Sequence, residues 1–393
     1  MEKHNVNCVE ENQCVGCKAC EAICPVSAIK MEKSDEGFEY PAILDELCIN
    51  CGKCVAFCPA LQSCAQNINP VKKIYAARCL QEEVLLKSSS GGIFGVLSEH
   101  CIEQKGVVYG VAFDENYCVE YVRGETYTDI NRMRGSKYVD AFMPEDLIQI
   151  FLSDVGGGRQ ILFSGTSCQI AGMKAVCEER KLKDDNIIWV DFFECSGKVS
   201  RLLWEGECQI YKKSGILEAV SFRDKTNGWK AFSMYQCISG KGFHTDFLLS
   251  RWSKFLGSAF SRRLPCLNCQ YSGGRCGADI SIGDFWNRSG LRITMPKKWK
   301  DNKGLSIVQV NTDKGAALFY DVEDCMDYME VQHSDNSKKG NKRVIDYEGR
   351  KQFWDVFNRH GYEELCNQYA NVTWKEKILL GKIRPLLIKL GLR

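Results

Sequence analysis

The stretches CVGCKACEAICP (14–25) and CINCGKCVAFCP (48–59) decide the fold of the N-terminal part of this chain. Each contains four cysteines with the spacing C-x2-C-x2-C-x3-C, and each ends on a proline. The second copy begins 34 residues after the first, at position 48 instead of 14, and the pair is the clear internal repeat of the sequence. Three thiolates at this spacing wrap one face of a cubane iron–sulfur cluster, while the fourth cysteine of each run ligates the other cluster.

The spacing therefore predicts two 4Fe-4S clusters that exchange their fourth ligands. The first is expected to be bound by Cys14, Cys17, Cys20 and Cys58, and the second by Cys48, Cys51, Cys54 and Cys24. Structural zinc is the alternative, because zinc also binds C-x2-C pairs. Zinc explains neither the four cysteines per run, nor the prolines, nor the duplication, so we favour the clusters. The segment resembles a bacterial two-cluster ferredoxin.

The composition of the 393 residues excludes several classes of protein. The chain is 45% apolar and 26% charged with a formal net charge of +2, which describes a globular protein and not a nucleic-acid binder or a disordered tail. No apolar run approaches the ~18 residues of a membrane span. The N-terminus has no apolar h-region, so no secretory signal is expected. Without an export signal, the 23 cysteines indicate metal ligation in a reducing cytoplasm.

Changes in composition along the chain predict an α+β ferredoxin domain followed by a mixed α/β domain and a tail. The expected segments are a two-cluster domain at 1–66, a linker at 67–73, the two parts of the α/β domain at 74–155 and 156–340, and a helical, basic tail at 341–393. The last 20 residues (374–393) interleave Lys and Arg with Ile and Leu at helical spacing. Such a segment can lie on an anionic membrane surface, and docking on the protein's own core is the alternative.

A strand–helix–strand unit in the middle of the chain predicts parallel β-sheet. Its parts are RQILFSG (159–165), QIAGMKAVCEER (169–180) and NIIWVDFF (186–193). The apolar run at 106–113 predicts another strand, and the runs at 278–285 and 305–311 are expected to extend the sheet.

Ligands of open α/β sheets bind outside the carboxyl ends of the strands. Cys168 follows the first strand of the unit and Cys195 follows the second, so both are expected at that edge. Cys266, Cys269 and Cys276 supply three more thiolates, with three-cysteine zinc as the alternative. We expect a third 4Fe-4S cluster with these three ligands and a fourth from Cys195 or Cys168. Cys195 is preferred because it heads a Ser-Gly turn directly after a buried strand.

Two segments have the composition of phosphate sites. Ser89, Ser90, Gly91 and Gly92 precede an apolar-periodic helix, and free N–H groups at a helix N-terminus bind phosphate well. A serine N-cap is the alternative explanation, and the segment alone favours it. RGSKY (134–138) allows the same two interpretations. GGG at 156–158 lacks the spacing of a dinucleotide fingerprint.

Taken in order, these segments resemble the coenzyme F-420 hydrogenase/dehydrogenase beta-subunit family, in its form with an N-terminal dicluster ferredoxin domain. The resemblance runs from Cys14 to Gly315 and is carried by the two cysteine runs, SSSGG, RGSKY, GTSCQIAG, FRDK…GW, the C-x2-C…C group and ADISIGDFW. It implies FAD and iron–sulfur clusters on a non-Rossmann, flavin-binding α/β domain. Relatives act on a deazaflavin coenzyme, a plant branch reduces a chlorophyll side group, and many bacterial members lie among surface-polysaccharide genes.

The sequence departs from the family pattern at three places. Ser167 replaces the proline of the commoner GTPCQ, ECSG replaces C-H-G, and Asn287 stands where a glycine often follows GDFW. Because ECSG lacks the histidine, a proton transfer at that position is not carried over.

The resemblance implies a flavin-phosphate site and an electron-transfer function. The expected flavin contacts are Ser89, Ser90, Gly91, Gly92, Ser136, Lys137, Gly165 and Thr166, with Lys137 neutralising the pyrophosphate. We expect an FAD-dependent oxidoreductase that passes electrons from a ferredoxin-type donor through the clusters to FAD, and on to a small-molecule or saccharide-linked substrate. The flavin carries the hydride chemistry, so no protein residue is assigned as catalytic. A deazaflavin (F-420) oxidoreductase subunit and an electron-transfer subunit without its own substrate are the alternatives.

Overall fold

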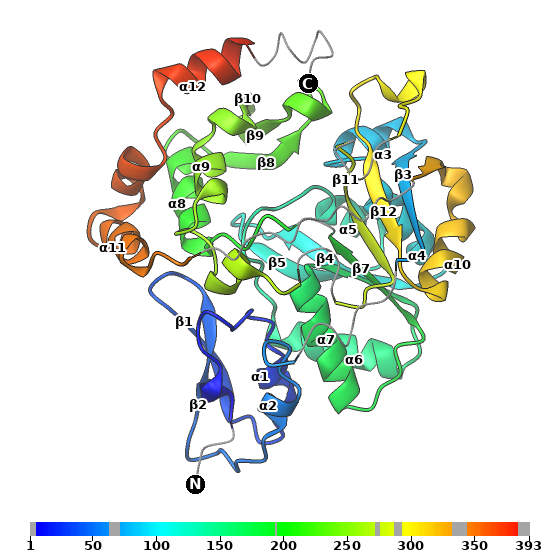
Figure 1. Cartoon of the computed structure of the whole chain (residues 1–393), viewed down its shortest axis with the longest axis vertical. Helices are drawn as coiled ribbons and strands as arrows, with labels where there is room; N and C mark the ends of the chain where they lie inside the picture. Colours follow the sequence, from blue (N-terminus) through cyan, green and yellow to red (C-terminus); the bar gives the residue numbers. More distant parts are fainter. Residues whose placement is uncertain are drawn as a thin grey trace.

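A computed structural model describes residues 5–62, 71–192, 195–271, 276–286, 293–331 and 344–383. Within them the chain forms a small N-terminal domain, an eight-stranded mixed sheet with helices, and a three-stranded antiparallel sheet (Figure 1). Residues 67–70 of the expected linker and 384–393 of the expected basic tail lie outside the described residues.

The N-terminal domain holds the two cysteine runs. Its elements are η1 (Val6–Cys8), α1 (Ala19–Ile23), β1 (Ile29–Lys33), β2 (Glu39–Ile43) and α2 (Lys53–Ala56), and β1 and β2 form an antiparallel hairpin. The repeat has the same backbone conformation in both copies. Gly16 and Asn50 are left-handed (φ 65° and 51°), and so are Lys18 and Gly52 (φ 61° and 73°), which directly precede α1 and α2.

The eight-stranded sheet has the order β13-β3-β12-β11-β7-β6-β4-β5. Its strands are β3 (Lys73–Cys79), β4 (Val107–Phe113), β5 (Val119–Gly124), β6 (Ile161–Gly165), β7 (Ile187–Phe192), β11 (Ile280–Asp284), β12 (Ser306–Val310) and β13 (Met326–Glu330). β4, β6, β7 and β11 are parallel to their neighbours in this series, which confirms the parallel sheet predicted around the strand–helix–strand unit. β12 is antiparallel to both β11 and β3, so β3 runs in the direction of β11.

Helices cover this sheet on two faces because its central strands alternate between two buried cores. Phe163 and Trp189 contribute to the core under α6 (Glu145–Gly156) and α7 (Ser167–Glu179). Leu162 and Val190 contribute to the opposite core, under α4 (Ile93–Glu103) and α10 (Asp313–Asp321). α3 (Glu82–Lys87) follows β3, and α5 (Tyr127–Met133) follows β5. α1 of the N-terminal domain joins the first core and packs on α7 (Figure 1).

The three-stranded sheet consists of β8 (Leu217–Asp224), β9 (Ser233–Ile238) and β10 (Lys241–Asp246). It packs with α8 (Arg201–Lys212), α9 (Arg251–Gly257) and α11 (Tyr347–Tyr369) around an aromatic core that includes Trp204, Phe222 and Trp252. The remaining elements are η3 (Trp229–Ala231), η4 (Phe247–Leu249), η5 (Leu264–Asn268), η6 (Lys297–Trp299), η7 (Glu323–Cys325), α12 (Trp374–Ile378) and η8 (Leu379–Ile383). Among the described residues, no helix is both long enough and apolar enough to cross a membrane.

Candidate functional site

The eight cysteines of the repeat surround two small cavities, four to each. Group 1 is the set around one cavity, formed by Cys14, Cys17, Cys20 and Cys58. Group 2 is the set around the other, formed by Cys24, Cys48, Cys51 and Cys54. Each cavity thus takes three cysteines from one run and the last cysteine of the other. These are the two sets that the spacing predicts.

The chemistry of these donor sets fits iron–sulfur clusters. Burial raises the pKa of Cys17 to about 12, and the nearby thiols of Cys58 and Cys14 add to the shift. A thiol in such surroundings ligates only when a metal stabilises the thiolate. Four cysteines standing around a space are the arrangement that a four-iron cluster takes.

A third group of cysteines lies at the carboxyl edge of the large sheet. Cys168 and the Cys266–Cys269 segment line one cavity of ≈ 340 Å³. Cys195 is exposed to solvent as a residue. Burial of its thiol, with the thiols of Cys168 and Cys269 nearby, raises the pKa of Cys195 to about 11. Burial, with Cys195 and Cys168 nearby, likewise raises the pKa of Cys266 to about 12. We call these four cysteines group 3.

Neither Cys276 nor Cys195 lines this cavity, but Cys195 lies near Cys168 and Cys269, whereas Cys276 lies beside Asp191, which differs from the expected ligand set. Cys276 is 1% exposed, and its Sγ lies 3.2 Å from Oδ2 of Asp191. Asp191 also accepts a hydrogen bond from Ser167 Oγ at 2.6 Å. Cys276 lies shortly before β11, whereas the C-x2-C pair lies on and beside η5. The structure therefore brings both Cys168 and Cys195 to the C-x2-C pair.

Most of the expected flavin contacts lie together at the same sheet edge. Ser90 Oγ donates to the carbonyl of Leu305 at 2.7 Å, and the N–H of Gly91 donates to Ser306 Oγ at 2.8 Å. The N–H of Ser136 donates to Ser89 Oγ at 2.7 Å. Gly91 is packed so closely between β3 and β12 that a Cβ atom would overlap the carbonyl oxygen of Ala77. Gly92 begins α4 without a side-chain cap.

Lys137 lies at the C-terminus of α5. Its Nζ donates to the carbonyl oxygens of Met133, Arg134 and Gly135 at 3.0, 3.1 and 3.2 Å. Burial, with Arg132 nearby, lowers the pKa of Lys137 to about 7. Its contact with a flavin phosphate stays a prediction.

Gly165 and Thr166 lie beside group 3. Thr166 Oγ1 is 3.3 Å from Cys168 Sγ, and a Cβ atom at Gly165 would lie 2.6 Å from the hydroxyl of Tyr121.

The FRDK and GDFW motifs have a structural role that sequence reasoning missed. Arg223 donates to both carboxylate oxygens of Asp284 at 2.7 and 3.1 Å and to the carbonyl of Ser89 at 3.0 Å. Trp229 stacks on Trp286 with ring centres 4.4 Å apart. The two motifs thus meet at the serine–glycine turn, where they fix its position.

The N-terminal domain contacts the large domain next to group 3. The 340 Å³ cavity is lined on one side by Asn12, Gln13, Val15 and Ala60, and on the other by Lys198 and three cysteines of group 3, Cys168, Cys266 and Cys269. Gly172 of α7 lies so close to Cys17 that a Cβ atom there would be 2.6 Å from the Cβ of Cys17. One turn earlier on the same helix lies Cys168.

Comparisons with known proteins agree with this arrangement. Residues 13–61 match the family described as 4Fe-4S dicluster domain, so the N-terminal domain is of the iron–sulfur class. Residues 158–336 match the family described as the C terminus of the coenzyme F420 hydrogenase/dehydrogenase beta subunit. The chain thus contains, in order, a segment similar to dicluster iron–sulfur domains and a segment similar to the C terminus of coenzyme F420 hydrogenase/dehydrogenase beta subunits. The family resemblance of the motifs is thereby confirmed.

Among solved structures, the chain is similar to one in the F420-reducing [NiFe] hydrogenase complex from Methanosarcina barkeri, studied by xenon derivatization. The identity is 16% and the TM-score 0.45, over 77% of this chain and 92% of that chain. No curated protein matches this chain.

Proposed function

We propose that this chain is an FAD-dependent iron–sulfur oxidoreductase that takes single electrons from a ferredoxin-type donor and delivers them to a small-molecule or saccharide-linked substrate. Groups 1, 2 and 3 hold one 4Fe-4S cluster each, with FAD bound along the sheet edge beside group 3. Bound clusters supply one-electron transfer, and bound flavin supplies the change to two-electron chemistry.

The observation that carries this proposal is the path of α7 past all three groups. Cys168 of group 3 lies at its start, and Gly172 touches Cys17 of group 1. Glu179, the last residue of α7, forms an ion pair with Lys53, with Oε1 and Nζ 2.5 Å apart. Lys53 directly precedes Cys54 of group 2. Since a helix rises about 1.5 Å per residue, these contacts are separated by about 6 and 10 Å along the helix. The groups therefore follow one another in a row.

Two features support a flavin at the edge of the sheet. The serine–glycine turn follows β3 and α3, Gly165 ends β6 and Thr166 follows it, so both segments lie at the carboxyl ends of strands that run in the same direction. Gly92 leaves the first turn of α4 without a side-chain acceptor, which suits a phosphate at that helix N-terminus. The flavin would span the edge from this turn to Cys168.

A deazaflavin oxidoreductase subunit is the second candidate, because the match over residues 158–336 is to beta subunits of that kind. The third is an electron-transfer subunit without its own substrate. Turnover of a reducible substrate by the pure chain favours an enzyme, whereas activity only with a partner favours the subunit.

We also propose that the tail makes peripheral contact with an anionic membrane. Trp374, Ile378 and Leu379 are exposed in the part of the tail that the structure describes, and Lys residues lie between them.

The content of iron, acid-labile sulfide and flavin tests the central proposal. Protein purified without oxygen is expected to carry about 12 irons and about one FAD per chain, counted as four irons for each of three clusters. Cys168→Ser and Cys195→Ser are each expected to lose about four irons, whereas Cys276→Ser keeps all of them. Loss of four irons in Cys276→Ser, with full iron in either of the other two, would contradict the group 3 assignment. Stoichiometric zinc without sulfide would overturn the whole proposal.

A further inference from the structure

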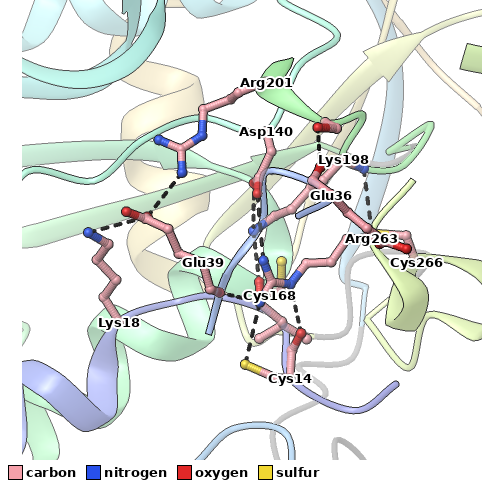
Figure 2. Close-up of polar contacts among 12 residues, drawn as sticks. Cys14, Lys18, Glu36, Glu39, Asp140, Cys168, Lys198, Arg201, Arg263 and Cys266 are labelled. Atoms are coloured by element: carbon pink, nitrogen blue, oxygen red, sulfur yellow. Dashed lines mark hydrogen bonds and ion pairs between the residues drawn. The ribbon is translucent and has the colours of Figure 1, made fainter. Parts of the chain in front are cut away.

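Arg263 belongs to the large domain but lies inside the N-terminal domain. It directly precedes η5, the element that carries Cys266 of group 3, and it is only 1% exposed. Its Nε donates to the carbonyl of Cys14 at 2.7 Å, and its Nη2 donates to the carbonyl of Glu39 at 2.6 Å. The same Nη2 lies 3.5 Å from the Sγ of Cys14 in group 1 (Figure 2).

The guanidinium group of Arg263 is held tightly in this place. It lies over the ring of Tyr40 at 4.4 Å. Gly16, in the left-handed conformation (φ 65°), leaves room for it, because a Cβ atom there would be 2.7 Å from the guanidinium carbon. Arginine keeps its proton at every pH that proteins tolerate, so this is a fixed positive charge.

A second buried cation lies at the same junction. Lys198 is 5% exposed, and its Nζ donates to the carbonyl of Val15 at 2.9 Å. The backbone nitrogen of Lys198 lies 3.4 Å from Cys266 Sγ (Figure 2). Lys198 therefore contacts both the cysteine run of group 1 and a cysteine of group 3. Asp140 is the buried carboxylate between the cations, 3.5 Å from Lys198 Nζ and 3.7 Å from Arg263 Nη1.

The buried side chains at this junction carry more positive than negative charge. The neighbouring carboxylates have cations of their own, because Glu39 pairs with Lys18 and Arg201, and Glu36 pairs with Arg350. Two buried cations therefore share Asp140. A buried charge without compensation is costly, so the surplus positive charge calls for a negative group at the same place. Thiolate-ligated iron on either side supplies one.

We propose that Arg263 and Lys198 are positioning residues that raise the reduction potentials at groups 1 and 3 relative to group 2. This rests on the proposed function, since it concerns clusters at those groups. Positive charge and hydrogen bonds to cysteine sulfur both favour the reduced state of a cluster. Cys24 of group 2 and Cys266 of group 3 both accept a neutral backbone N–H, from Ala28 at 3.2 Å and from Lys198 at 3.4 Å, so the difference between the groups lies in the buried charges of Arg263 and Lys198. An electron that leaves group 2 is thus drawn to the junction between the domains.

The test is an anaerobic redox titration followed by electron paramagnetic resonance, with iron content measured on each sample. Arg263→Gln removes the charge, and Arg263→Lys keeps it. For Arg263→Gln we expect at least one midpoint potential to fall by about 59 mV. This shift corresponds to a tenfold change in the equilibrium constant for one-electron reduction. Arg263→Lys is expected to restore part of the shift.

Arg350→Gln combined with Glu36→Gln is the matched control, because it removes a buried ion pair at the same junction without changing the net charge. Arg350 is a buried arginine that also joins the two domains, but its hydrogen bonds go to Glu36 and to the carbonyls of Ala259 and Arg262 and not to a cysteine. The double variant is expected to leave all midpoints in place. Unchanged midpoints in a fully iron-loaded Arg263→Gln, or an equal shift in the control, would overturn the inference.

A second variant decides the matter if Arg263→Gln fails to retain iron. Lys198→Met removes the other cation and leaves the hydrogen bonds of Arg263 to Cys14 in place. A midpoint lowered in the loaded protein supports the inference, and unchanged midpoints overturn it. Wild-type protein that carries no clusters contradicts the proposed function itself, which is a separate outcome.

Discussion

At the scale of single residues, Gly172 decides how closely the N-terminal domain lies against α7. The space for a side chain at this position is already filled by Cys17, whose Cβ, Sγ and carbonyl oxygen all lie within 3.4 Å of where a Cβ atom would be. Cys17 cannot retreat easily, because it is packed in the same apolar core as Ile23 of α1. The close approach of the two domains therefore depends on the absence of one methyl group.

Gly172→Ala is expected to weaken the docking of the N-terminal domain by about 1–3 kcal/mol, the usual cost of overpacking. Anaerobic urea unfolding, followed through the visible absorbance of the clusters, measures the loss. Gly156→Ala is the control, since Gly156 ends α6 and nothing lies within 4 Å of the added atom. The control is expected to be neutral or more stable by about 0.5–1 kcal/mol. Equal midpoints for the two variants would contradict the role given to Gly172.

Single residues also show where sequence reasoning succeeds. Groups 1 and 2 follow from spacing, because all eight cysteines belong to one local repeat. Group 3 collects cysteines from three separate segments, after β6, after β7 and at η5, so no local spacing identifies it. Cys276 is closer in sequence to the C-x2-C pair than Cys168 and Cys195 are, but its position is fixed by the strand that follows. Arg263 carries no motif, and its role is visible only in three dimensions.

At the scale of elements, an ion pair ties the β1–β2 hairpin to α11. Arg350 is 4% exposed, and its Nε donates to Oε1 of Glu36 at 2.7 Å. Burial raises the pKa of Glu36, and the contact with Arg350 opposes that shift. The hairpin is therefore held at its turn by the C-terminal helix, far along the chain.

Arg350→Met is expected to destabilise the protein by about 2–4 kcal/mol at pH 8, because it leaves a partly buried carboxylate without its partner. The loss should shrink toward pH 5. Without Arg350, the pKa of Glu36 in the folded state rises further above its unfolded value, so the penalty is absent where Glu36 is protonated and appears as the pH rises through the folded pKa.

Thermal unfolding at several pH values checks this expectation. Lys87→Met is the control, since Lys87 pairs with Glu83 on the surface of α3 and such pairs contribute about 0.5 kcal/mol or less. A loss in Arg350→Met that does not change with pH would contradict the assignment.

Elements differ in how far the sequence predicts them. β6, α7 and β7 were predictable because continuous apolar runs mark buried parallel strands. The sheet of β8, β9 and β10 was not, because β10 has exposed residues along nearly its whole length and offers no apolar pattern. Its partners are set by the aromatic core under β8 and β9, which forms from distant segments.

At the scale of the whole molecule, α12 and the N-terminal domain lie at opposite ends (Figure 1). α12 is attached by an ion pair between Lys254 and Glu376, and Trp374 remains 67% exposed. A membrane bound at this end would leave groups 1 and 2 facing away from it, where a diffusing electron donor can reach them.

The full chain is expected to sediment with anionic lipid vesicles more strongly than a chain that ends at residue 372. The difference should decrease as salt is added, because screening weakens the attraction of the Lys residues to the lipid surface. Neutral vesicles of phosphatidylcholine serve as the control. Equal binding of the two chains to anionic vesicles would exclude a role for the tail.

The exchange of the last cysteine between the two runs makes their assembly cooperative. Neither cavity is complete until both runs are folded, because each takes one wall from the other run. We therefore expect the two clusters to be loaded together, so that a domain with one cluster is rare in anaerobically purified protein. Loss of the last cysteine of either run removes a ligand from the site built mainly by the other run.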